Sequence, residues 1–330
     1  MNELLNKGTF IISLDFELAW GIIEKDSLNT YCKTNICNVG QVVHRMLDLF
    51  EKYNVKATFA TVGFLMCHNK EEIKKYIPHK TPSYKEKTLS PYSGFLDSIT
   101  DESPLYFAPS IIEKLKSNDN IEIGTHTFCH YYCLEEGQTV EEFEDDIISA
   151  TKLANDNGIE IQSIVFPRNN INSDYLRVCF RHGIICYRGN ANKFYGKVKN
   201  RVKLIRNRLG RLIDSYLPLN SGSCYKYSCL LPKEGCPINV PASRFFRPYN
   251  KKLSLIEPLR IIRIQREIKH AAKVGELYHL WWHPHNFGAN INKNLDNLEK
   301  VLKYYSKCRE KYGMQSLTMS DVAKMIKSDE

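Results

Sequence analysis

Short apolar runs alternate with amphipathic helical patterns along most of the chain, and this alternation restricts the possible folds more than any other feature. The runs are rich in Val, Ile, Thr and Phe, and we expect strands at 9–15, 55–61, 121–125, 161–166, 184–187, 277–283 and 316–319. Helical patterns include 39–53, 140–155, 256–273 and 295–312. Strands separated by helices are typical of parallel β/α units, so we predict an α/β fold with a parallel sheet.

Two stretches, 69–110 and 189–250, interrupt this alternation. The first is polar and holds several Lys, Pro and Ser residues, and the second has a basic first half and a half that contains Cys and Pro. We interpret both as insertions into a single domain that spans 1–330, because 330 residues suffice for one α/β barrel with insertions.

Charge and cysteine usage narrow the class of protein. The 46 Lys and Arg residues against 37 Asp and Glu give a formal net charge of +9, which favours acidic partners. No nucleic-acid-binding motif accompanies this charge, so we expect that the protein does not bind nucleic acid.

An acidic residue precedes any apolar run of signal-peptide length, and the 11 cysteines form no C-x-x-C pair. We therefore expect a cytoplasmic protein with reduced thiols, while the role of Cys224, Cys229 and Cys236 stays open.

The first predicted strand ends in two acidic residues, Asp15 and Glu17. Successive side chains of a strand point to opposite faces, so these two share a face while Leu14 and Phe16 point the other way. Parallel β/α folds build their sites at the carboxyl ends of strands, where two carboxylates repel each other unless a cation or a shared proton lies between them. The alternative is a solvated strand end with two unrelated acids.

Two histidines, His126 and His130, follow the strand 121–125. If the segment turns helically, the spacing of four residues directs both imidazoles to one side, as two ligands of a tetrahedral divalent metal require. Together with Glu17 they would form a Glu-His-His set with open positions for water. We expect Zn²⁺ in first place, although other divalent metals are compatible. The alternative is a pair of hydrogen-bonded histidines without a metal.

An arginine and a further histidine also follow predicted strands. Arg168, in the segment FPRNN, provides a cation that could pair with Asp15, and His283 ends the aromatic strand 277–283. Taken singly, Arg168 could form a surface salt bridge and His283 could be a packed core residue.

These four segments, in this order, resemble four of the five motifs of the polysaccharide deacetylase family, the NodB-homology group classed as carbohydrate esterase family four. Residues 15–17 (DFE) resemble a split D-x-E form of the first motif, and 126–130 (HTFCH) meet the second motif in full. Residues 166–169 (FPRN) and 280–283 (LWWH) resemble the arginine motif and the last motif. Asn169 replaces the family's aromatic residue, and no acidic residue lies in 186–190 to orient His283.

The resemblance implies a distorted, incompletely closed (β/α) barrel and a metal-dependent hydrolase that removes an N-acetyl group from an amino sugar. It assigns the metal to Glu17, His126 and His130 and the catalytic work to Asp15, Arg168 and His283. Asp15 would accept a proton from water, Arg168 would pair with Asp15 and keep it ionised, and His283 would protonate the departing amine.

Other readings remain open at this point. Some relatives hydrolyse linear or cyclic amides that are not sugars, and release of acetate from N-acetylated sugars would separate the two. A binding protein on a decayed enzyme scaffold, acting on nucleic acid or a membrane surface, is a more remote alternative. The sugar would be a glycan precursor that is free, nucleotide-linked or lipid-linked. The sequence leaves open its carrier, the acyl group, the metal and the oligomeric state.

The segment 193–212 has the pattern of a basic amphipathic helix. Eight Lys or Arg residues and no acidic residue lie between positions 193 and 211, and apolar residues recur at helical spacing. The simpler interpretation is a solvated basic face packed on the barrel. The alternative hypothesis is that this face binds the anionic inner face of a membrane or the diphosphate of a sugar carrier.

Overall fold

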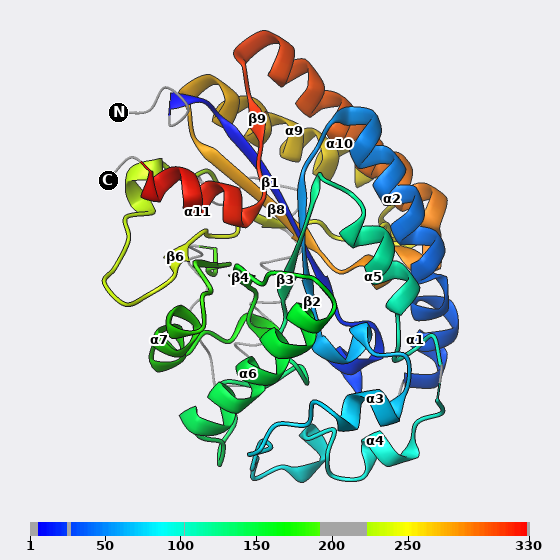
Figure 1. Cartoon of the computed structure of the whole chain (residues 1–330). Helices are drawn as coiled ribbons and strands as arrows, with labels where there is room; N and C mark the ends of the chain where they lie inside the picture. The colour runs from blue at the N-terminus through cyan, green and yellow to red at the C-terminus, as the bar shows by residue number, and fades with distance from the viewer. Residues whose placement is uncertain (1–5, 25–27, 102, 192–222, 329–330) are drawn as a thin grey trace, which may run out of the picture.

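A curled parallel sheet forms the centre of the computed structural model, which describes residues 6–24, 28–101, 103–191 and 223–328 (Figure 1). Its strands are β1 (Thr9–Phe16), β2 (Ala57–Thr61), β3 (Ile121–Thr125), β4 (Ser163–Ile164), β5 (Cys186–Tyr187), β6 (Ile238–Asn239), β7 (Arg244–Phe245), β8 (Leu277–Trp282) and β9 (Gln315–Ser316). The order across the sheet is β6-β5-β4-β3-β2-β1-β8-β7, and β9 pairs with β1. All these strand pairs are parallel, which confirms the α/β barrel that the sequence predicts.

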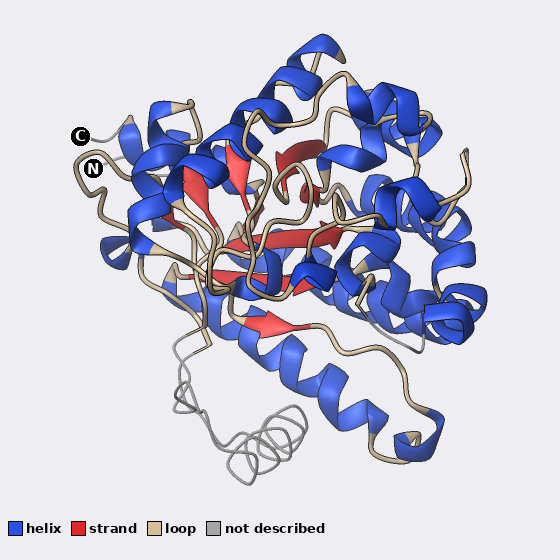
Figure 2. Cartoon of the chain, turned by 90° about the horizontal axis from the view of Figure 1, so that it is seen from below, coloured by secondary structure: helices blue, strands red, loops and turns tan. Residues whose placement is uncertain are grey.

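Helices lie around the strands (Figure 2). The described ones are α1 (Leu28–Thr34), α2 (Val39–Tyr53), α3 (Lys70–Lys74), α4 (Phe95–Ser98), α5 (Pro109–Lys116), α6 (Val140–Asp156), α7 (Ser173–Arg181), α9 (Glu257–Val274), α10 (Ile291–Tyr312) and α11 (Met319–Lys327). Local sequence fixes several ends. Thr139 and Glu142 form a capping box at the start of α6, while Gly275 and Gly313 end α9 and α10 in the left-handed conformation.

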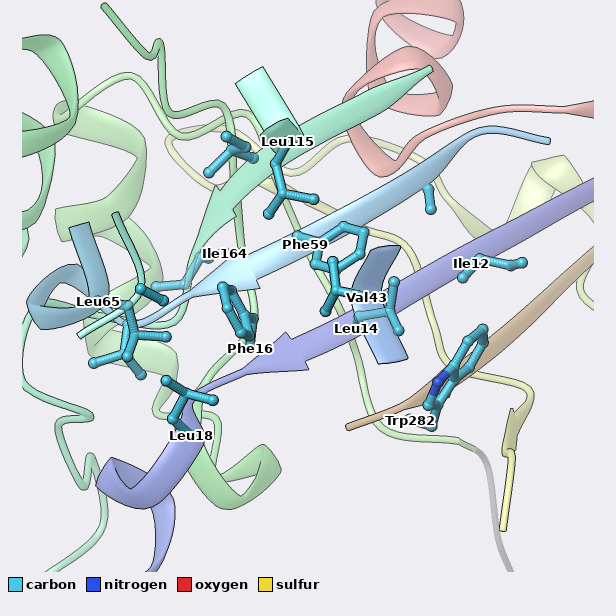
Figure 3. Close-up of a cluster of buried hydrophobic side chains, with 14 of the residues drawn as sticks. Ile12, Leu14, Phe16, Leu18, Val43, Phe59, Leu65, Leu115, Ile164 and Trp282 are labelled. Carbon is cyan, nitrogen blue, oxygen red and sulfur yellow. The ribbon is translucent and has the colours of Figure 1, made fainter. Parts of the chain in front are cut away.

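The alternation of side chains along β1 divides the interior into two layers. Ile12, Leu14 and Phe16 point outward into a large apolar cluster beneath the helices, where Val43 of α2 and Phe59 of β2 also lie (Figure 3). Ile11 belongs to a second cluster, which also holds apolar side chains of β5, β6 and α11. The outward layer therefore anchors the helices, and the other face of β1 is left for the inside of the barrel.

The barrel is irregular where its two edges meet. The segment 238–246 pairs first with β5 and then with β8, so β6 and β7 are two short pieces of one crossing segment. Within it the N–H of Ala242 donates to the carbonyl of Gly189, and the N–H of Ser243 donates to the carbonyl of His279. The stretch 189–250, which we expected to be an insertion, thus contributes two strands to the sheet.

The other expected insertion, 69–110, carries α3 and α4 and no strand among its described residues. The predicted basic helix at 193–212 lies outside the described residues. None of the helices in the described part of the chain combines the length and apolar content needed to cross a bilayer. All eleven cysteines are free thiols.

Candidate active site

Six polar side chains gather at the carboxyl ends of the parallel strands. Asp15 belongs to the end of β1 and Glu17 follows it, His126 and His130 follow β3, Arg188 follows β5, and His283 follows β8. Because parallel strands end at one side of a barrel, residues far apart in the sequence meet there. Asp15 and Glu17 both reach this cluster, as the two-residue period of the first strand predicts.

Glu17 and the two histidines form a buried set of converging ligand atoms. The Oε2 atom of Glu17 lies 3.0 Å from Nε2 of His130 and 3.3 Å from Nε2 of His126, and the three side chains offer ligand atoms within 4.8 Å of one another. Nδ1 of His126 donates to the carbonyl of Val165 at 2.7 Å, which leaves the lone pair of Nε2 free. That buried Nε2 has no hydrogen-bond partner among the described residues, as expected of an atom that binds a metal.

The two histidines converge without a helical turn, contrary to the conformation that we considered from their spacing. Residues 126–133 form an irregular loop in which Thr127 and His130 have φ angles of 67° and 61°. Left-handed backbone is rare for residues other than glycine and asparagine, and it persists only where the surroundings enforce it. Two left-handed residues therefore direct both imidazoles toward Glu17.

A buried carboxylate holds this loop in place. The side chain of Asp146, on α6, accepts hydrogen bonds from the backbone N–H groups of Phe128 at 2.7 Å and Cys129 at 3.1 Å. Burial raises the pKa of Asp146 to about 6, although the two N–H donors and the Cys129 side chain oppose this shift. Thr127 adds a further support, because its hydroxyl accepts from the N–H of Tyr131. The ligand geometry thus rests on residues outside the ligand set.

Arg188 is the cation that pairs with Asp15. Its two terminal nitrogens lie 2.6 and 2.7 Å from the two carboxylate oxygens, and the pair is buried. The guanidinium also stacks over the ring of Trp281 and donates to the side chain of Asn169. Burial alone would raise the pKa of Asp15, but the charges of Arg188 and His283 outweigh it and hold the carboxyl pKa below its ordinary value.

The expected pairing of Arg168 with Asp15 is therefore wrong. Arg168 lies in a left-handed conformation, with φ of 55°, that turns its side chain toward the mouth of the site. There it forms ion pairs with Glu24 and Glu135 and lies over the ring of Tyr132 at 3.9 Å. Arg188 follows a predicted strand just as Arg168 does, so the same positional rule indicates both residues and does not choose between them.

Below Asp15, a polar network continues into the barrel. The hydroxyl of Ser13 accepts from Arg188 at 3.1 Å and lies 2.8 Å from Nε2 of His279. All three side chains are buried. Burial and the charge of Arg188 lower the pKa of His279 to about 3, so its imidazole stays neutral and its Nε2 accepts a hydrogen bond from the Ser13 hydroxyl. Neither Ser13 nor His279 is among the residues that the sequence singled out.

His283 faces both carboxylates from the opposite side. Its Nε2 atom lies 3.7 Å from Oδ2 of Asp15 and 3.6 Å from Oε1 of Glu17, and its ring stacks on His285. Nδ1 of His283 has no hydrogen-bond partner among the described residues, so no acidic side chain of the described chain orients the ring through that nitrogen. Aromatic contacts with Phe245 and Trp281 hold it instead.

A pocket of about 540 Å³ opens onto this cluster. Glu17, His130 and His283 form part of its wall, and Tyr31, Arg168 and Phe245 line it further out. This volume is typical of sites for small molecules. An open pocket with convergent carboxylates and imidazoles, at the carboxyl end of a β/α barrel, is the arrangement that a hydrolytic enzyme requires.

A family model matches part of the sequence. Residues 35–186 match the family model described as polysaccharide deacetylase. Residues 35–186 therefore carry a polysaccharide deacetylase domain, and this match supports a hydrolase that acts on amide bonds. The matched range includes His126, His130 and Arg168, whereas Asp15 and Arg188 lie outside it. No curated protein sequence matches the chain.

Solved structures share the fold at low identity. A Mycobacterium smegmatis protein assigned to the polysaccharide deacetylases aligns with a TM-score of 0.62 at 12% identity, covering 98% of this chain and 92% of that one. A Pseudomonas aeruginosa PAO1 protein with the same assignment has a TM-score of 0.54 at 10% identity, covering 96% and 89%. A 4-alpha-glucanotransferase from Thermococcus litoralis reaches 0.53 at 10%, covering 97% and 40%. Since such different enzymes share the fold, the chemistry must be argued from the site.

Proposed function

We propose that this deacetylase is metal-dependent and removes the N-acetyl group of an amino sugar. The observation that carries the proposal is the convergence of Glu17, His126 and His130 on one buried point, beside the Asp15–Arg188 pair and His283. The donor set of one carboxylate and two imidazoles suits Zn²⁺ and leaves positions open for water and substrate. When bound, such a metal polarises the amide carbonyl and lowers the pKa of water.

The chain's own residues supply the proton transfers. Asp15 accepts the proton of the attacking water, and Arg188 orients this carboxylate and keeps it ionised through two hydrogen bonds. His283 delivers a proton to the nitrogen as the carbon–nitrogen bond breaks, so the products are acetate and a free amine. Arg168, which we expected beside Asp15, acts at the mouth of the pocket on the substrate.

The substrate proposal rests on the pocket and the family. The pocket's volume of about 540 Å³ accommodates a sugar with part of its carrier, and Tyr31 and Phe245 provide aromatic walls. We propose a nucleotide-linked or lipid-linked N-acetylated sugar of a glycan precursor, handled in the cytoplasm. The eleven free thiols support the location, because such thiols are typical of reducing compartments.

Metal analysis combined with acetate release tests this proposal. Purified protein should contain about one divalent ion per chain and release acetate from one member of a panel of free, nucleotide-linked and lipid-linked N-acetylated sugars. His126→Ala should lose metal and activity together, whereas Asp15→Asn should retain metal and lose most turnover. Full activity after chelation would contradict the mechanism, and release of amine from non-sugar amides alone would shift the substrate class.

A further inference from the structure

An exposed apolar patch lies at the start of α9. Leu255 is 95% exposed, and Ile256, Leu259 and Ile262 are 38%, 45% and 42% exposed. Of these four residues, here called the rim patch, Leu255 and Ile256 immediately precede α9, and Leu259 and Ile262 lie in its first two turns. Single exposed apolar residues are ordinary, but a contiguous group of large aliphatic side chains marks a surface that binds something.

The rim patch lies on the catalytic side of the barrel. Strand β7 ends at Phe245, which lines the catalytic pocket, and the chain then runs directly to Leu255 and into α9. Because loops that follow parallel strands emerge at their carboxyl ends, this loop shares a rim with the pocket. The carboxyl end of α9 lies about 27 Å away from Ile256 along the helix, since each residue adds 1.5 Å.

Lysines surround the rim patch. Lys251 and Lys252 precede it and are exposed, and Lys293 and Lys300 of α10 line a groove of about 510 Å³ together with Ile262. The groove also contains the exposed Asp296 and the buried Glu257, whose charge is paired with Arg260. The surface is therefore aliphatic at its centre and positively charged at its margin.

We propose that the rim patch docks on an anionic phospholipid surface, with the four aliphatic side chains entering the interface and the lysines contacting headgroups. A surface with exposed aliphatic side chains and flanking lysines has the two attractions that interfacial binding requires. A second copy of the chain is a poorer occupant, because a twofold contact would bring two lysine-rich surfaces together. Docking would hold the pocket rim next to the lipid, where a lipid-linked sugar is presented. That consequence, unlike the docking itself, rests on the proposed function.

Co-sedimentation of the full chain with vesicles tests the docking. Wild-type protein should bind vesicles containing phosphatidylserine at low salt, bind phosphatidylcholine vesicles much more weakly, and dissociate at high salt. Leu255→Ser/Leu259→Ser should lower the affinity for the anionic vesicles at least tenfold. Lys251→Gln/Lys252→Gln should lower it roughly fivefold for each lysine. Val274→Ser changes an aliphatic residue at the far end of α9 that is 52% exposed, close to Leu259, and this control should bind like wild type.

Three outcomes would overturn the proposal. Wild-type protein could fail to bind anionic vesicles, or the Leu255/Leu259 variant could bind as tightly as the Val274 control, which would assign the binding to another surface. Alternatively, the wild type could form a dimer that the same variant abolishes, which would make a second copy the occupant. Acetate release from a soluble substrate should be unchanged in every variant, so failure of docking is distinguishable from failure of the proposed activity.

Discussion

Replacing Arg188 by methionine should destabilise the protein far more than the same replacement of Arg168. The variant leaves the Asp15 carboxylate buried without its ion-pair partner, since both guanidinium hydrogen bonds to Asp15 disappear while side-chain length is kept. Removal of one member of a buried pair costs about 3–5 kcal/mol, because the remaining charge is uncompensated. The matched change, Arg168→Met, removes ion pairs of a side chain that is 35% exposed, so its cost should be about 1 kcal/mol or less.

The sign of the pH dependence distinguishes this explanation from a general loss of packing. In the wild type the pKa of Asp15 is depressed on folding, so its contribution to stability is present above the unfolded pKa of about 3.9 and is lost as the pH falls below it. Without Arg188, burial dominates and raises the carboxyl pKa, so part of that contribution should be missing at neutral pH. The variant should then gain stability relative to wild type as the pH is lowered.

Urea unfolding of the chelated protein between pH 4 and 8 provides the measurement, with acetate release of the metal-loaded enzyme as the second readout. Arg188→Met should lose most turnover and about 3–5 kcal/mol of the free energy of unfolding at pH 7, whereas Arg168→Met should lose about 1 kcal/mol or less. If Arg168→Met were the less stable of the two variants, or if Arg188→Met kept full turnover, the assignment of Arg188 to Asp15 would be refuted.

Two further predictions concern Asp146 and His283. The pKa of Asp146 is raised to about 6, so its contribution to stability is fully present below about pH 4 and is lost as the pH rises through 6. The free energy of unfolding of the wild type should therefore fall by about 3 kcal/mol between pH 4 and 7, and Asp146→Asn should lack this decline. Urea unfolding across this pH range provides the measurement. An identical pH slope in wild type and variant would contradict it. His283→Ala should lose most turnover and keep its metal, and loss of turnover in His285→Ala alone would move the proton donor to that residue.

The long, regular helices and strands of the barrel could be predicted from the sequence. The helices predicted at 39–53 and 140–155 agree with α2 and α6 to within one residue, and the strand at 121–125 agrees with β3. Periodicity succeeds there because each element buries one continuous face. The segment that contains β6 and β7 has Cys and Pro residues in place of a continuous apolar run, so it was assigned to an insertion.

At the active site, the sequence predicts which residues follow strands but not which of them contact each other. Sequence order indicates which residues follow strands, and on that basis Asp15, His126 and His283 meet as expected. It does not indicate which of two arginines reaches across the barrel, because that choice depends on the left-handed backbone at Arg168 and on the space beneath Asp15. The left-handed residues of the histidine loop are equally invisible, since they are imposed by distant groups such as Asp146.

The position of β1 has a consequence for synthesis on the ribosome. This strand, which ends at Asp15 and Phe16, pairs with β2 on one side and with β8 and β9 on the other, and β8 begins at Leu277. At roughly 5–20 residues per second, β8 emerges on the order of 13–50 seconds after β1. For that time one edge of a strand that is fully buried in the folded protein lacks its neighbour, so a nascent chain should depend on chaperone protection until β8 has been translated.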